Sequence, residues 1–103
     1  MSHQNIVMKK MHSSDSIIYY HVSDYINNFD FFIAIHTKEK LIKYYLSNNF
    51  ETAPVATIDF SNPSKKIGTV TNINNDTAIR TSFLAYKAFI NNDFPEILSY
   101  VSS

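Results

Sequence analysis

The chain has 103 residues, a mass of 11.9 kDa and a formal net charge of zero, because nine basic residues balance nine acidic ones. A chain of this length is expected to fold as a single domain over residues 1–103 and to bury roughly 60–65% of its unfolded surface. The balanced charge, with Arg80 as the only arginine, argues against a nucleic-acid partner, and the lack of cysteine excludes disulfides and thiolate metal sites.

The first half of the chain is predicted to be rich in strands. Residues 1–14 are expected to form a mobile N-terminus, whereas "SIIYYHV" at 16–22, dense in Ile and Tyr between polar clusters, is typical of a strand. The segment "FDFFIAIH" at 29–36 alternates with apolar residues on both faces, which predicts a central strand. Residues 38–47, which include "LIKYYLS", fit either a strand or a helix, and the strand of a hairpin is the preferred interpretation.

Two more strands are predicted in the middle of the chain. The segment "PVATIDF" at 54–60 alternates regularly, as in an antiparallel strand with one solvated face. After the turn-like "SNPSKK", the segment "KIGTVTNI" at 66–73 reads as a returning strand. Its Gly68, the only glycine, indicates a bulge or a close backbone approach.

The last third is predicted to form two amphipathic helices. Asn and Asp residues at 74–76 are suitable caps, and a stripe follows at spacings of four, three and four residues: Ile79, Phe83, Tyr86 and Ile90. Asn91 and Asn92 can end this helix, and Pro95 can begin a second one over residues 94–101. With the stripe packed on a sheet, the expected fold is α+β: an antiparallel β-meander of about four to five strands with the C-terminal helices on one face.

Histidine is the residue type here that titrates near neutral pH, and the chain has four: His3, His12, His21 and His36. His21 and His36 end two neighbouring predicted strands, so an acid–base pair is conceivable, with Asp24 or Asp59 as the orienting carboxylate. Surface histidines are the plainer interpretation. No metal-ligand motif, nucleophile elbow or glycine-rich phosphate loop is present, so we expect neither an enzyme nor a cofactor or metal site.

Targeting signals are also missing from the sequence. The N-terminal segment has no apolar core of the length that a secretory signal needs. The longest apolar run, "FFIAI", is far shorter than a membrane span. We therefore expect a cytoplasmic protein without a membrane partner.

Tyrosine is more abundant than a core of this size requires. Adjacent Tyr pairs in a strand place one ring outward, and exposed Tyr is favoured at protein interfaces. Together with nearby acidic residues, this pattern predicts a partner-binding surface at Tyr20, Glu39, Tyr44 and Asp59. The competing interpretation is that these are ordinary residues of β-strands and solvated faces.

The C-terminal segment "YKAFINNDFPEILSYVSS" has a helix–FPE–helix pattern, in a small, neutral, cysteine-free chain rich in Asn and Ile. In these features the chain resembles the immunity proteins of contact-dependent growth inhibition and polymorphic toxin systems in bacteria. The resemblance implies a protein that covers the active site of a cognate toxin and needs no cofactor. The alternatives are a small regulatory or antitoxin-like binding protein of a mobile element, and a histidine-dependent hydrolase or nuclease.

Overall fold

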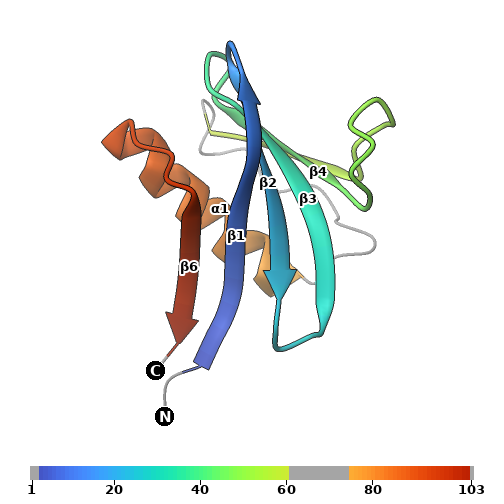
Figure 1. The fold of residues 1–103 in the computed structure, drawn as a ribbon, viewed down its shortest axis with the longest axis vertical. Helices are drawn as coiled ribbons and strands as arrows, with labels where there is room; N and C mark the ends of the chain where they lie inside the picture. The colour runs from blue at the N-terminus through green and yellow to red at the C-terminus, as the bar shows by residue number, and fades with distance from the viewer. Residues whose placement is uncertain (1–2, 61–74, 103) are drawn as a thin grey trace.

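The structure is a computed structural model, and it describes residues 3–60 and 75–102. In chain order the elements are β1 (His3–Ser14), β2 (Ile17–Asp24), β3 (Phe29–His36), β4 (Leu41–Tyr45), β5 (Ala56–Asp59), α1 (Asn75–Asn91) and β6 (Ile97–Ser102). The strands form one antiparallel sheet in the order β5-β4-β3-β2-β1-β6, and α1 crosses one of its faces (Figure 1). The α+β meander is confirmed, but the described residues contain six strands and one helix.

The predicted strands at 16–22, 29–36 and 54–60 correspond to β2, β3 and β5. They form because each alternates apolar residues toward a common core and is bounded by polar turn residues. The strand predicted at 66–73 lies outside the described residues.

The ambiguous segment at 41–47 contains a strand, β4, as the hairpin interpretation predicted. Residues 37–40 connect it to β3 so that His36 pairs with Leu41. Lys40 has a positive φ of 57° and closes this four-residue turn in the left-handed conformation. The turn therefore returns the chain directly onto β3.

Both ends of the chain form strands that were not predicted. Residues 3–14, expected to be mobile, form β1, which pairs with β2 on one side and β6 on the other. The helix predicted at 94–101 is wrong, because most of this segment is β6. Its Leu98 and Tyr100 pack against the core. The spacing of the apolar residues fits both the 3.6-residue period of a helix and the two-residue period of a strand. The strand forms because a helix here would leave the hydrogen-bonding edge of β1 unpaired.

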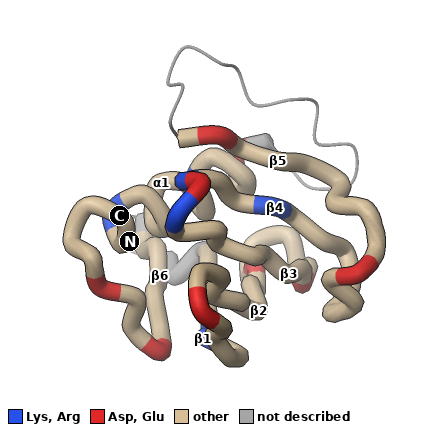
Figure 2. The backbone as a smooth tube through the Cα atoms, turned by 90° about the horizontal axis from the view of Figure 1, so that it is seen from above, with Lys and Arg blue, Asp and Glu red and all other residues tan. Residues whose placement is uncertain are grey.

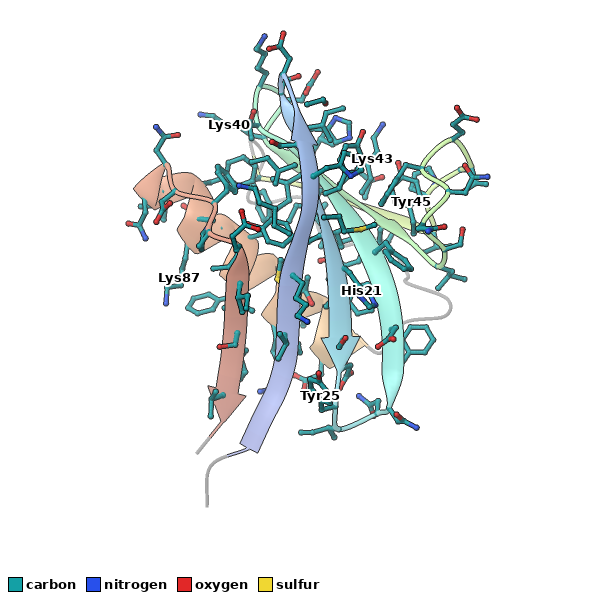
Figure 3. The ribbon with its side chains drawn as sticks, viewed as in Figure 1. His21, Tyr25, Lys40, Lys43, Tyr45 and Lys87 are labelled. Carbon is teal, nitrogen blue, oxygen red and sulfur yellow. The ribbon has the colours of Figure 1, made fainter. Side chains whose placement is uncertain are left out.

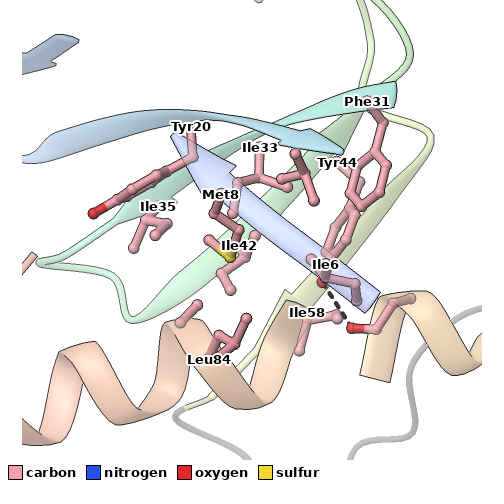
Figure 4. Close-up of a cluster of buried hydrophobic side chains, with 13 residues drawn as sticks. Ile6, Met8, Tyr20, Phe31, Ile33, Ile35, Ile42, Tyr44, Ile58 and Leu84 are labelled. Atoms are coloured by element: carbon pink, nitrogen blue, oxygen red, sulfur yellow. Dashed lines mark hydrogen bonds between the residues drawn. The ribbon is translucent and has the colours of Figure 1, made fainter. Parts of the chain in front are cut away.

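The core lies between the sheet and α1 (Figure 4). Its largest fully buried side chains come from the sheet, among them Tyr20, Phe31 and Tyr44. The helix contributes mainly small ones, such as Ala78 and Ala85. Large rings from the sheet meet mainly small side chains of the helix, which lets the two layers approach closely.

The predicted helix is present as α1, and Asn92, with φ of 50°, ends it in the left-handed conformation. The predicted orientation of the helix is wrong. The apolar stripe faces outward, with exposed fractions as follows: Ile79 54%, Phe83 51%, Tyr86 46% and Ile90 64%. The buried face is the small-residue one. Helical periodicity identifies a stripe but not the side on which it lies. The large rings of the sheet favour the helix face that carries mainly small residues, together with Leu84.

Hydrogen bonds tie α1 and the following segment to the sheet. The buried Tyr44 hydroxyl donates to the carbonyl of Ala78 at 3.1 Å, the dashed line in Figure 4. The Tyr20 hydroxyl donates to the carbonyl of Pro95 at 2.6 Å, and the Lys10 Nζ donates to that of Phe94 at 2.9 Å. Burial, with smaller contributions from nearby acidic residues, raises the pKa of Tyr20 to about 12, so this hydroxyl stays a donor at neutral pH. These bonds hold the N-terminal part of α1 and the segment between α1 and β6 against the sheet.

Two phenylalanine truncations distinguish the observed orientation of α1 from the predicted one. Phe31→Ala empties a buried site and is expected to lower the free energy of unfolding by about 3–5 kcal/mol. Phe83→Ala removes a half-exposed ring and should cost less than about 1 kcal/mol. Urea unfolding of both variants measures the two values. Equal losses for both variants would contradict the outward orientation of the stripe.

Candidate protein-binding surface

Two of the four predicted partner-binding residues lie in the core. Tyr20 and Tyr44 are 0% exposed, so the prediction that they face outward is wrong. Strand alternation explains this result, because Tyr20 shares a face with Val22, and Tyr44 shares a face with Ile42, all buried apolar positions. Neither tyrosine can contact a partner in the folded protein.

The other two predicted residues lie near the same end of the sheet. Glu39 is in the β3–β4 turn, and its Oε2 is 3.8 Å from Nδ1 of His36. Asp59 is in β5, opposite Leu41 of β4. The four predicted residues are therefore not brought together on one surface.

The predicted histidine pair does not form. His36 lies opposite Ile17 of β2, and His21 lies four residues further along that strand, which separates the two by roughly 13 Å. His21 instead stacks on Phe32, with its Nε2 3.5 Å from Asp30 Oδ2. Burial lowers the pKa of His36, and Lys43 adds to this effect more than Glu39 opposes it.

The face of the sheet opposite α1, hereafter the open face, carries a cluster of aromatic rings. Phe50, from the loop after β4, lies at its centre, with ring centroids 4.5 Å from Tyr19, 5.0 Å from Tyr45 and 6.3 Å from Phe32. Ala34 of β3 is also on this face and is only 1% exposed. The rings therefore form a second, smaller apolar layer.

The loop that carries Phe50 is held by its own hydrogen bonds. The Oδ1 of Asn49 accepts from the backbone N–H of Glu51 at 3.1 Å, and its carbonyl accepts from the Thr52 hydroxyl at 2.7 Å. Beyond this turn, the N–H of Val55 donates to the carbonyl of Tyr44 at 2.8 Å. The loop thus starts and ends on β4, and this geometry positions Phe50 over the sheet. No strand pattern in the sequence could have identified this residue.

An irregularity in β1 brings a further ring to the open face. The register between β1 and β2 shifts between Lys10 and His12, so that His12 pairs with Tyr19. Their rings stack with centroids 4.4 Å apart. Without the extra residue, alternation would place His12 on the same side as Met8, toward α1. The bulge therefore adds an exposed aromatic ring to the edge of the cluster.

Charged residues of both signs lie near these rings, and Asp30, beside His21, is the acidic one. Lys9 pairs in register with His21, and Lys43 pairs with Ala34 on the other side of the cluster. Figure 3 labels His21, Lys43 and Tyr45 on strands β2 and β4. Figure 2 shows acidic and basic residues interspersed along the described chain. The open face thus combines accessible rings with a mixed charged rim.

The described residues show neither a metal site nor a membrane-spanning helix. Residues 3–60 and 75–102 contain no group of three or more His, Cys, Asp or Glu side chains placed to hold a metal ion. In the same part of the chain, no helix has the length and apolarity needed to cross a membrane. No protein-family model matches the chain, and no curated protein or solved structure is significantly similar to it.

Asp24, a predicted orienting carboxylate, has a structural role on the helix side. It is 3% exposed, and its carboxylate accepts hydrogen bonds from the backbone N–H groups of Ile26 and Asn27 at 3.1 Å each. The Asn27 side chain and the Thr77 hydroxyl donate to its other oxygen. These bonds join the β2–β3 turn to the first turn of α1. Burial by itself would raise the pKa of Asp24, but the hydrogen bonds outweigh it and hold the pKa below its usual value.

The lowered pKa of Asp24 predicts a pH-dependent contribution to stability. The ionised carboxylate stabilises the fold above the unfolded-state pKa of about 4, and this contribution is lost as the pH falls through the lower folded-state pKa. Asp24→Asn should cost about 1–3 kcal/mol at pH 7, since charged hydrogen bonds are replaced by neutral ones. Urea melts of both proteins at pH 7 and pH 3 should show a smaller difference at pH 3. A difference that does not change with pH would refute the role of the charge.

Proposed function

We propose that the protein binds a partner protein through the open face and, as an immunity protein, neutralises a bacterial toxin by covering its active site. The observation that carries this proposal is the set of rings on that face, with His12 exposed and Tyr19 half-buried beside Phe50. Aromatic rings provide contact area at low entropic cost and commonly supply most of the binding energy of an interface.

The mixed charges around the rings support a protein partner. Lys9 and Lys43 lie near the cluster, while Asp30 adds an acidic group whose side chain is 62% exposed. An aromatic centre within a polar rim is the usual anatomy of a protein interface. Because the chain is neutral overall, its charge does not select a strongly basic toxin.

The toxin is proposed from the resemblance of the sequence to small immunity proteins. A regulatory or antitoxin-like protein of a mobile element would use the same kind of surface and differ in its partner. A histidine-dependent hydrolase or nuclease would need an acid–base group at a substrate site. The two described hollows, at the N-terminal end of α1 and near its C-terminal end, are not lined by a histidine.

Binding to a toxin domain, if one is encoded beside the gene, tests the proposal, and the absence of any toxin that binds would refute it. Tyr19→Ala should weaken binding by about thirtyfold, or about 2 kcal/mol, because it removes a partly exposed ring that lies between His12 and Phe50. His12→Ala should weaken binding in the same direction. Isothermal titration calorimetry on the purified pair measures both effects.

Tyr25→Ala is the matched control, since Tyr25 is 64% exposed but lies in the β2–β3 turn, away from the rings. This variant should bind like the wild type. Melting temperatures of all variants separate loss of binding from loss of structure. Wild-type affinity for Tyr19→Ala, or an equal loss for Tyr25→Ala, would refute the open face as the binding surface.

A further inference from the structure

The exposed apolar stripe of α1 has the spacing of a coiled-coil seam. Its four residues, hereafter the outer stripe, are Ile79, Phe83, Tyr86 and Ile90, and each is between 46% and 64% exposed. Steps of four, three and four residues correspond to consecutive d, a, d and a positions of a heptad repeat. Such a seam fits against another helix.

The outer stripe is also symmetric about its midpoint. Read backward, it has the same spacing and the same order of residue kinds, with Ile at each end and two aromatic residues between. If a second copy lies antiparallel, a two-fold axis between Phe83 and Tyr86 sets Ile79 against the partner's Ile90 and Phe83 against the partner's Tyr86. A different helix would need the spacing only, whereas this symmetry matches a second copy of the same chain.

We infer that the protein forms a two-fold dimer through antiparallel packing of its α1 helices. Two such stripes and their flanks would bury roughly 1,000 Å² in total, near the lower end for a specific interface. The dimer should therefore be weak, with a dissociation constant on the order of micromolar. Because the open face lies on the other side of the sheet, dimerisation leaves it accessible in both copies.

The charges beside the outer stripe are compatible with pairing between copies. The stripe contains no charged residue, and Arg80 Nε lies 2.9 Å from Asp76 Oδ2 on the same helix. Lys87 lies over the Phe83 ring, with its Nζ 5.5 Å from the ring centroid, and it can extend to solvent at the rim. Lys40 also borders the stripe, in the hollow that Tyr86 and Ile90 line. Like Lys87, it is exposed and can keep its ammonium group in solvent at the rim, where repulsion between cations is screened by salt.

Disulfide trapping tests both the dimer and its direction, because the chain has no cysteine of its own. Ile79→Cys and Ile90→Cys are prepared separately and oxidised mildly, alone and as a mixture. In the antiparallel dimer the two different cysteines face each other, whereas two copies of residue 79 are about 16 Å apart, beyond disulfide reach. The mixture should therefore form covalent dimers at least about tenfold faster than either variant alone.

Sedimentation equilibrium from about 1 to 200 µM provides an independent measurement in the range of weak dimers. The wild type should change from monomer to dimer with concentration, and Phe83→Glu should remain monomeric. Ile26→Glu, which alters a 62% exposed residue of the β2–β3 turn, should behave like the wild type. A wild type that is monomeric throughout overturns the inference. Cross-linking of Ile79→Cys alone as fast as the mixture overturns the antiparallel arrangement.

Discussion

The packing of large rings against small helical residues determines most of this structure. Tyr20, Phe31 and Tyr44 fill the space over the sheet and are fully buried. The helix approaches them with a face of mainly small residues, among them Ala78 and Ala85, together with Leu84. Burial of the two tyrosine hydroxyls requires partners, and the carbonyls of α1 and the segment after it accept their hydrogen bonds. The fit of small helix residues against the rings and the hydrogen bonds of the tyrosine hydroxyls thus favour the same orientation of the helix.

This constraint leaves apolar residues on two surfaces. On the helix side, the outer stripe of α1 faces away from the sheet. On the open face, the loop carrying Phe50 covers part of the strands, and Tyr19 and His12 remain beside it. A chain of this size cannot bury all of its apolar surface, and contiguous exposed apolar patches are often interaction sites. The two surfaces lie on opposite sides of the molecule, so the proposed partner and the proposed second copy would not compete for the same residues.

The sequence was informative wherever one local rule determines the structure. Alternation and turn residues predicted β2 and β3, and periodicity predicted α1. It was not informative at 94–101, where the apolar spacing fits a helix and a strand equally well. It was also not informative for β1, which is a strand because it pairs with β2 and with the distant β6. The orientation of α1 depends on the volume of sheet residues far away in the chain. Tyr20 could have been placed inside, because it alternates with Val22, whereas Phe50 lies in a loop whose position no periodicity encodes.

Thiol labelling of single cysteines in the native protein tests the orientation of α1 most directly, because the chain contains no other cysteine. Ala85 is 0% exposed and Phe83 is 51% exposed, only two residues apart on the same helix. Under native conditions, and at protein concentrations well below the micromolar range, where the chain is monomeric, Phe83→Cys should react with a thiol reagent at nearly the rate of a free thiol. Ala85→Cys should react only at the rate at which the protein unfolds. Fast labelling of Ala85→Cys together with protection of Phe83→Cys would contradict the packing described.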